Sequence, residues 1–81
     1  MSELSRLRWR CRRGIKEMDL IFERFLDQYY SSLSPQQIQV FDQLLDETDL
    51  DIMDWILMRT EPDNNEYVEL LNMFRQFRPD N

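Results

Sequence analysis

The residues with the clearest chemical potential lie near the N-terminus, where a tryptophan stands among basic side chains. On a helical wheel Trp9 points away from the apolar stripe of its own segment. That stripe consists of Leu4, Leu7 and Cys11. On its outer side, Trp9 has as neighbours Arg6, Arg10, Arg13 and Lys16. Trp and Arg are enriched at protein interfaces because they offer large contact area and bidentate hydrogen bonds. The pattern favours a protein-binding surface, although in so small a domain Trp9 could equally pack against a neighbouring helix.

A glycine follows this basic segment and leaves backbone bare between two charged side chains. Gly14 is the only glycine in the chain, and we expect it to end the first helix because glycine readily takes the left-handed conformation of a helix C-cap. Arg13 would then close one helix, and Glu17 would lie in the first turn of the next. Both charges complement a helix dipole, so spacing alone favours this structural interpretation of Arg13 and Glu17 over a partner contact.

The composition excludes most kinds of catalytic site. The chain has no histidine, which removes Ser-His-Asp and Cys-His systems, and one glycine cannot form a phosphate-binding loop. The single cysteine, Cys11, lies on the apolar stripe and is expected to be a buried structural thiol. The carboxylates from Asp42 to Asp54 lack the glycine and alternating spacing of a calcium loop, so a solvated surface is expected there. We therefore expect that the chain has no catalytic residue and no metal ligand, and that it is not an enzyme.

The charges of the chain are unevenly distributed. The net charge is −6, with 10 basic and 16 acidic residues. The first 16 residues hold six of the basic residues against a single acidic one, Glu3. A basic end on an acidic body suggests an oriented encounter with a partner.

Helices must position these side chains. A chain of 81 residues has room for one domain, residues 1–81, and its content of 42% hydrophobic and 12% aromatic residues indicates a folded core. One glycine leaves few hairpin turns. Apolar residues recur at helical spacing in five segments. The sequence therefore predicts an all-α fold, a small five-helix bundle in a single domain.

The second and third helices have the clearest signals. The second is expected from residue 15 or 16 to 30 and should be central, because its apolar stripe is broad. This stripe consists of Met18, Ile21, Phe22, Phe25, Leu26 and Tyr29. The opposite face, with Asp19, Glu23 and Asp27, is expected to be solvated. The run Ser34-Pro35-Gln36-Gln37 predicts a capped start of the third helix.

The other three helices are shorter or less sharply bounded. The first is expected near residues 2–12. The fourth should be capped by Thr48 or Asp49, with Ile52, Met53, Ile56 and Leu57 facing inward. Trp55, beside this run, is expected in the core. The last helix should end before Pro79, with a core face made of Tyr67, Leu70, Leu71, Phe74 and Phe77.

Residues 9–19 carry a longer signature. They read Trp-Arg-Cys-Arg-Arg-Gly-Ile-Lys-Glu-Met-Asp. This run resembles W-x-C-R-R-G-x-x-E-x-D, the signature of the succinate dehydrogenase FAD assembly factors, whose hallmark is Arg-Gly-x-x-Glu. The turn at residues 32–34, the segment from Asp51 to Trp55 and the overall length are also similar to that family. The resemblance covers nearly the whole chain.

The resemblance implies a function and a set of contact residues. Members of this family are five-helix bundles that bind the flavoprotein subunit of succinate dehydrogenase, and in bacteria also that of fumarate reductase. They promote covalent attachment of FAD to a histidine of that subunit, so the FAD belongs to the partner and no cofactor is expected to be bound tightly here. The partner-binding residues expected on this basis, with two basic neighbours added from the helical wheel, are Arg13, Gly14, Glu17, Trp9, Arg12, Asp19, Lys16 and Arg10.

Such a factor would act by positioning its partner. Because the flavin reacts with its own apoprotein, the factor needs no nucleophile, which agrees with the missing histidine. It would hold the flavoprotein so that the acceptor histidine and the flavin methyl group are aligned. We expect Arg13→Ala or Glu17→Ala to abolish this support while leaving the helical fold intact. This expectation requires Arg13 and Glu17 both to reach outward at the Gly14 turn.

Other classes of function fit parts of the sequence. The N-terminal arginines with Trp9 could bind nucleic acid, as in a small regulatory or antitoxin-like protein, but the acidic body repels phosphates. The basic segment could lie on an anionic membrane or serve in mitochondrial import, but cleavage there would remove the signature. We expect a monomer in the bacterial cytoplasm rather than the mitochondrial matrix, with no nucleic-acid partner and no membrane insertion.

Overall fold

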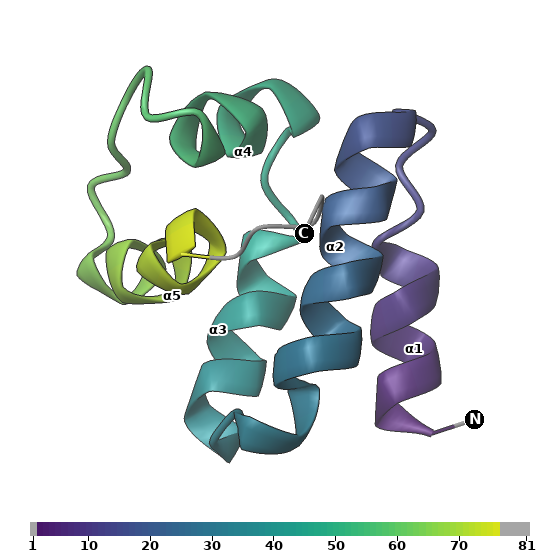
Figure 1. Cartoon of the computed structure of the whole chain (residues 1–81). Helices are drawn as coiled ribbons and strands as arrows, with labels where there is room; N and C mark the ends of the chain where they lie inside the picture. The colour runs from purple at the N-terminus through teal and green to yellow at the C-terminus, as the bar shows by residue number, and fades with distance from the viewer. Residues whose placement is uncertain (1, 77–81) are drawn as a thin grey trace.

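The computed structural model describes residues 2–76, which form five α-helices and one short 3-10 turn (Figure 1). The elements are α1 (Glu3–Arg10), α2 (Lys16–Tyr29), η1 (Tyr30–Ser32), α3 (Pro35–Leu44), α4 (Asp49–Ile56) and α5 (Asn65–Gln76). Within this range there is no strand, so the predicted all-α bundle of five helices is confirmed. None of the helices between residues 2 and 76 has the length and apolar character needed to cross a bilayer.

Local signals in the sequence set where these helices begin. The Ser34 hydroxyl accepts from the Gln37 N–H at 3.1 Å, and the Gln37 side chain accepts from the Ser34 N–H at 2.8 Å. This is the predicted capping box, with Pro35 as the first residue of α3. Between the two candidates for the cap of α4, the structure selects Thr48, whose hydroxyl accepts from the Asp51 N–H. Such a cap contributes about 1 kcal/mol.

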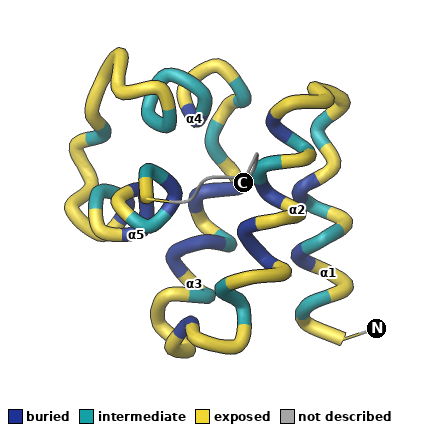
Figure 2. Tube along the Cα trace, viewed as in Figure 1, coloured by how far each residue is buried: buried dark blue, intermediate teal, exposed yellow. Residues whose placement is uncertain are grey.

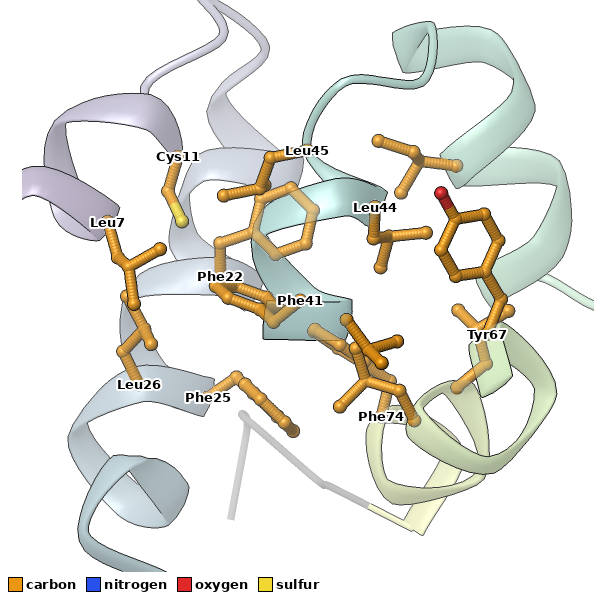
Figure 3. Close-up of a cluster of buried hydrophobic side chains, with 14 of the residues drawn as sticks. Leu7, Cys11, Phe22, Phe25, Leu26, Phe41, Leu44, Leu45, Tyr67 and Phe74 are labelled. Carbon is orange, nitrogen blue, oxygen red and sulfur yellow. The ribbon is translucent and has the colours of Figure 1, made fainter. Parts of the chain in front are cut away.

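Stacked aromatic rings from three helices form the core (Figure 3). Phe25 of α2 stacks on Phe74 of α5, with ring centroids 3.9 Å apart. The Phe22 ring meets Phe41 of α3 edge-on at 5.9 Å. Full burial of such side chains contributes about 1.5–3 kcal/mol each. The central place predicted for α2 is therefore confirmed, although Ile21 and Tyr29 of its stripe are only partly buried.

The end of α4 departs from the prediction. Leu57 was expected to face inward, but it is 55% exposed. It follows Ile52, the fully buried residue of this helix, by five positions, which places the two about 140° apart on the helical wheel. Met58 then takes a positive φ of 64° and the chain turns away. Trp55 packs partly buried against Tyr67. Phe77, expected on the core face of the last helix, and Pro79, expected to follow the end of that helix, lie outside the described residues.

Candidate functional site: the corner between α1 and α2

A tight turn joins α1 to α2, and Gly14 lies in it with a φ of +87°. This backbone conformation favours glycine. A Cβ atom at this position would meet nothing within 4 Å, so the turn leaves open space beside the backbone. Figure 2 shows the turn as mostly exposed. Gly14 is not the C-cap of α1 as expected, because α1 already ends at Arg10 and Cys11 caps it in a right-handed conformation.

Asp19 holds this turn against α2. Its two carboxylate oxygens accept hydrogen bonds from the Arg13 N–H at 2.8 Å and the Gly14 N–H at 3.3 Å. The side chain is half-buried, so the prediction that it lies on a solvated face is wrong. The cause is local: the N–H groups of the turn have no helical partner, and a carboxylate in the first turn of α2 can reach them.

Arg13 points into the molecule, and the expectation that it reaches outward is wrong. Its Nε donates to Asp49 at 2.6 Å, and its two terminal nitrogens donate to the carbonyl oxygens of Leu45 at 2.6 Å and Glu47 at 2.8 Å. Only 15% of its side chain is exposed. The carbonyls of Leu45, which caps α3, and of Glu47, in the connection that follows, have no helical N–H donor, and the planar guanidinium satisfies both together with the carboxylate of Asp49. Arg13 therefore fastens the corner to the α3–α4 connection and to the first turn of α4.

Three more N-terminal arginines pair with the chain's own acidic residues. Arg10 binds Asp42 and Asp46, and Arg6 binds Asp42 at 3.0 Å. On the other flank of α1, Arg8 binds Asp27 of α2. These contacts differ from one prediction, because the basic end was expected to face a partner. Asp27 itself remains 58% exposed, as expected for the solvated face of α2. Helix α1 lies against acidic residues on both flanks, so most of its charge is neutralised within the molecule.

The pKa of Asp42 reflects this arrangement. Its partial burial alone would raise the pKa, but the hydrogen bonds from Arg6 and Arg10 outweigh that effect and hold it below the ordinary value. The carboxyl group therefore stays ionised at neutral pH and anchors α1 to α3. The carboxylates between Asp42 and Asp54 were expected to be solvated surface, and for Asp42 and Asp49 that prediction is wrong, because arginines cover them.

A second group of motif residues faces solvent. Trp9 is 72% exposed, which selects the outward alternative left open by the sequence. Arg12, Lys16 and Glu17 are also exposed, and within residues 2–76 none of their side chains makes a hydrogen bond or an ion pair. We call these four residues together with Gly14 the outer corner. The inner corner consists of Arg10, Arg13 and Asp19. The predicted site residues thus divide into five that are exposed and three whose side chains are bonded within the chain.

A small hollow of about 220 Å³ opens between α1 and α2 beside the outer corner. Its lining residues are Arg8, Cys11, Arg12, Asp19 and Glu23. Burial raises the pKa of the Cys11 thiol to about 12, although Arg13, Arg10 and Arg8 act in the opposite direction. The thiol is therefore protonated at neutral pH, as expected for a structural cysteine. No group of side chains between residues 2 and 76 is arranged to hold a metal ion.

Comparison with known proteins identifies the family. A family model described as flavinator of succinate dehydrogenase matches residues 5–78. The chain is 35% identical over 71 residues to the FAD assembly factor SdhE of Coxiella burnetii. The matched residues make up 88% of this chain and 87% of that protein. It is 38% identical over 71 residues to the protein of the same name from Idiomarina loihiensis, covering 88% of this chain and 79% of the relative.

A third relative, the FAD assembly factor SdhE of Ralstonia nicotianae, is 46% identical over 59 residues, which are 73% of this chain and 62% of the relative. No solved structure matches the chain significantly. The relatives are named as assembly factors rather than as enzymes, in agreement with the expectation that the chain is not an enzyme. The motif that holds the α1–α2 corner and the matches along most of the chain agree: this protein belongs to the flavinator of succinate dehydrogenase family.

Proposed function

We propose that this chain promotes covalent attachment of FAD to the flavoprotein subunit of succinate dehydrogenase, and that it binds this subunit through the outer corner. The observation that carries the proposal is the division of the corner. Arg13 and Asp19 form hydrogen bonds within the chain that hold the turn in place. Arg12 and Glu17, in contrast, are exposed, and their side chains form no hydrogen bond or ion pair among residues 2–76. Charged side chains presented on a braced turn are suited to an oriented contact.

Each residue of the outer corner offers a different kind of contact. Glu17 supplies an acceptor, Arg12 and Lys16 supply donors, and Trp9 supplies aromatic area. Gly14 adds open backbone that a partner can approach. Loss of one member of a buried, hydrogen-bonded charge pair costs about 2–5 kcal/mol of binding. Because the turn is already braced by the inner corner, little ordering entropy is lost when a partner binds.

The proposed mechanism is positioning of the flavoprotein. The outer corner binds the apoprotein in the arrangement that aligns its acceptor histidine with the flavin methyl group, and this raises the fraction of productive conformers. The FAD stays with the partner throughout. The buried, protonated Cys11 thiol takes no part in the reaction.

The proposal is tested by producing the flavoprotein subunit with and without this chain and measuring in-gel flavin fluorescence after denaturation, which reports covalent FAD alone. We expect strong fluorescence with the wild-type chain and near-background fluorescence with Glu17→Ala. Gln39→Ala, which changes an exposed side chain on α3, serves as the control and should support attachment fully. Wild-type levels of covalent FAD with Glu17→Ala would remove Glu17 from the site.

The proposal has three further parts, which concern a second client, the oligomeric state and the location of the chain. We propose that the flavoprotein of fumarate reductase is a second client, which the same fluorescence assay tests with that subunit. We also propose that the chain acts as a monomer in the bacterial cytoplasm. Sedimentation of the purified chain tests whether it is a monomer, and cell fractionation tests whether it lies in the cytoplasm.

Nucleic-acid binding receives less support than protein binding. Arg6, Arg8 and Arg10 pair with the chain's own carboxylates, which leaves few cations to contact phosphates. A gel shift in low salt tests this alternative, and a retarded nucleic-acid band would favour it.

A further inference from the structure

Helix α4 presents an apolar surface to solvent. Leu50 is 70% exposed, Leu57 is 55% exposed and Met58 is 66% exposed. Leu50 and Leu57 stand seven residues apart, which places them on the same side of the helix, two turns from each other. We call Leu50, Leu57 and Met58 the α4 stripe. These residues are half of the exposed large apolar side chains found between residues 2 and 76, and they lie within nine residues of sequence.

The α4 stripe begins beside the corner. Asp49, which precedes Leu50, accepts the hydrogen bond from Arg13 at 2.6 Å. In Figure 1 the first turn of α4 accordingly lies near the start of α2, at one end of the bundle. On α4, Leu50 and Leu57 lie about 140–160° around the helix from Trp55, whose ring contacts Tyr67 of α5. These two leucines therefore occupy the flank of α4 that does not face α5.

Met58 adds an independent observation. It is the only residue other than glycine with a positive φ between residues 2 and 76. It lies just after the helix, where the Arg59 N–H donates to the Asp54 carbonyl at 2.8 Å and closes the turn. Glycine is favoured at such a position, since it adopts this conformation without strain. The chain instead has a long, exposed apolar side chain at this position. The stability of the fold alone does not favour such a residue there.

We infer that the α4 stripe is the second half of the docking surface and that it packs on an apolar patch of the same flavoprotein subunit bound by the outer corner. This inference rests on the proposed function. The Arg13–Asp49 contact fixes α4 relative to the Gly14 turn, so one partner meets both halves at a set spacing. The outer corner then supplies orientation through its charges, and the stripe supplies apolar contact area.

A second copy of the chain fits the stripe less well. In a symmetric dimer the same surface patch faces itself. Asp51 is exposed on α4 and has no ion-pair partner among residues 2–76, whereas Asp54 is paired with Arg59 at 3.1 Å. A contact between two α4 helices would therefore bring acidic residues of like charge together, which disfavours association. The net charge of −6 acts in the same direction.

The test uses two variants of the stripe and calorimetric titration of the apo flavoprotein subunit. Leu50→Gln combined with Leu57→Gln keeps helix propensity and length while removing apolar surface. We expect the double variant to weaken binding by about tenfold or more. Met58→Gly removes the side chain at a position where glycine is favoured, so we expect weaker binding with an unchanged or raised thermal midpoint. Gln39→Ala is the control and should bind as wild type does.

The arms of the experiment separate this inference from the proposed function. If Glu17→Ala weakens binding but the stripe variants bind as wild type does, the stripe is not part of the interface and the inference is overturned. If wild-type chain does not bind the flavoprotein at all, the proposed function and the inference fail together. If the stripe variants abolish self-association and leave flavoprotein binding unchanged, the stripe contacts a second copy, which also overturns the inference.

Discussion

The inner and outer corners put the same kinds of residue to different uses. Arg12 and Arg13 are neighbours in sequence, yet Arg13 makes three side-chain hydrogen bonds and is 15% exposed, whereas Arg12 is exposed with no side-chain partner among residues 2–76. Asp19 and Glu17 differ in the same way within the first turn of α2. The comparison teaches that Arg-Gly-x-x-Glu combines an internal brace, a turn and an exposed acceptor.

The largest expected effect on stability comes from the brace, by which we mean the three hydrogen bonds of the Arg13 side chain to Asp49, Leu45 and Glu47. Arg13→Ala leaves two carbonyls and Asp49 without their donor, and charge-assisted hydrogen bonds with little exposure are among the stronger ones. We expect the free energy of unfolding to fall by about 2–4 kcal/mol. Urea denaturation measures it. The matched control is Arg12→Ala, which should change the value by less than about 0.5 kcal/mol. Equal losses for the two variants would erase the distinction between the inner and outer corners.

This prediction corrects the expectation that Arg13→Ala leaves the fold intact. Loss of flavin attachment in Arg13→Ala does not by itself identify a partner contact, because the brace is lost as well. The variant Arg13→Lys tests whether stability depends on the guanidinium group itself or only on a positive charge at this position. A single ammonium group cannot span the three acceptors that the guanidinium reaches, so we expect an intermediate stability.

A smaller effect is expected at the turn. Gly14→Ala places a Cβ atom at a φ of +87°, where there is space but the backbone conformation is strained. The expected loss of stability is about 1–2 kcal/mol, measured by thermal unfolding. Gly14→Asn should lose less, since asparagine tolerates positive φ better than alanine. If alanine were accepted without loss, the turn would be adaptable rather than fixed.

The smallest effect concerns acid stability. The pKa of Asp42 in the folded chain lies below its ordinary value of 3.8, so its contribution to stability is fully present above that pH. The contribution is lost as pH falls below about 3.8 through the lower folded value. Asp42→Asn should therefore lower the thermal midpoint at pH 7 and make it less sensitive to acid. A variant whose midpoint falls with acid as steeply as that of the wild type would mean that Asp42 carries little of this dependence.

Much of the fold could be predicted because its signals are local. The capping box at Ser34, the periodic stripe of α2 and the need for glycine at position 14 all depend on neighbouring residues. The partners of the arginines could not be predicted in this way. Arg13 and Asp49 are 36 residues apart, and no spacing rule connects them. The excess of basic residues at one end and acidic residues elsewhere was a signal for such pairing, but it also fits attraction to a partner.

The outer corner was predicted in composition rather than in detail. The helical wheel pointed Trp9 away from its own apolar stripe, and the structure selects this outward alternative of the two that the sequence left open. The wheel also grouped Trp9 with Arg6, Arg10 and Arg13, which the structure turns toward acidic residues. A wheel gives the direction of a side chain relative to its own helix. It does not show which neighbouring helix offers an ion partner.

The most direct measurement of the central claim compares Glu17→Ala with wild type in two assays on the same preparation. The account predicts that the thermal midpoint stays within about 2 °C of wild type, because Glu17 makes no side-chain bond among residues 2–76. It also predicts that covalent flavin fluorescence of the flavoprotein falls to near background. Full flavin attachment, or a loss of stability as large as that of Arg13→Ala, would contradict the division of this corner into a brace and a docking surface.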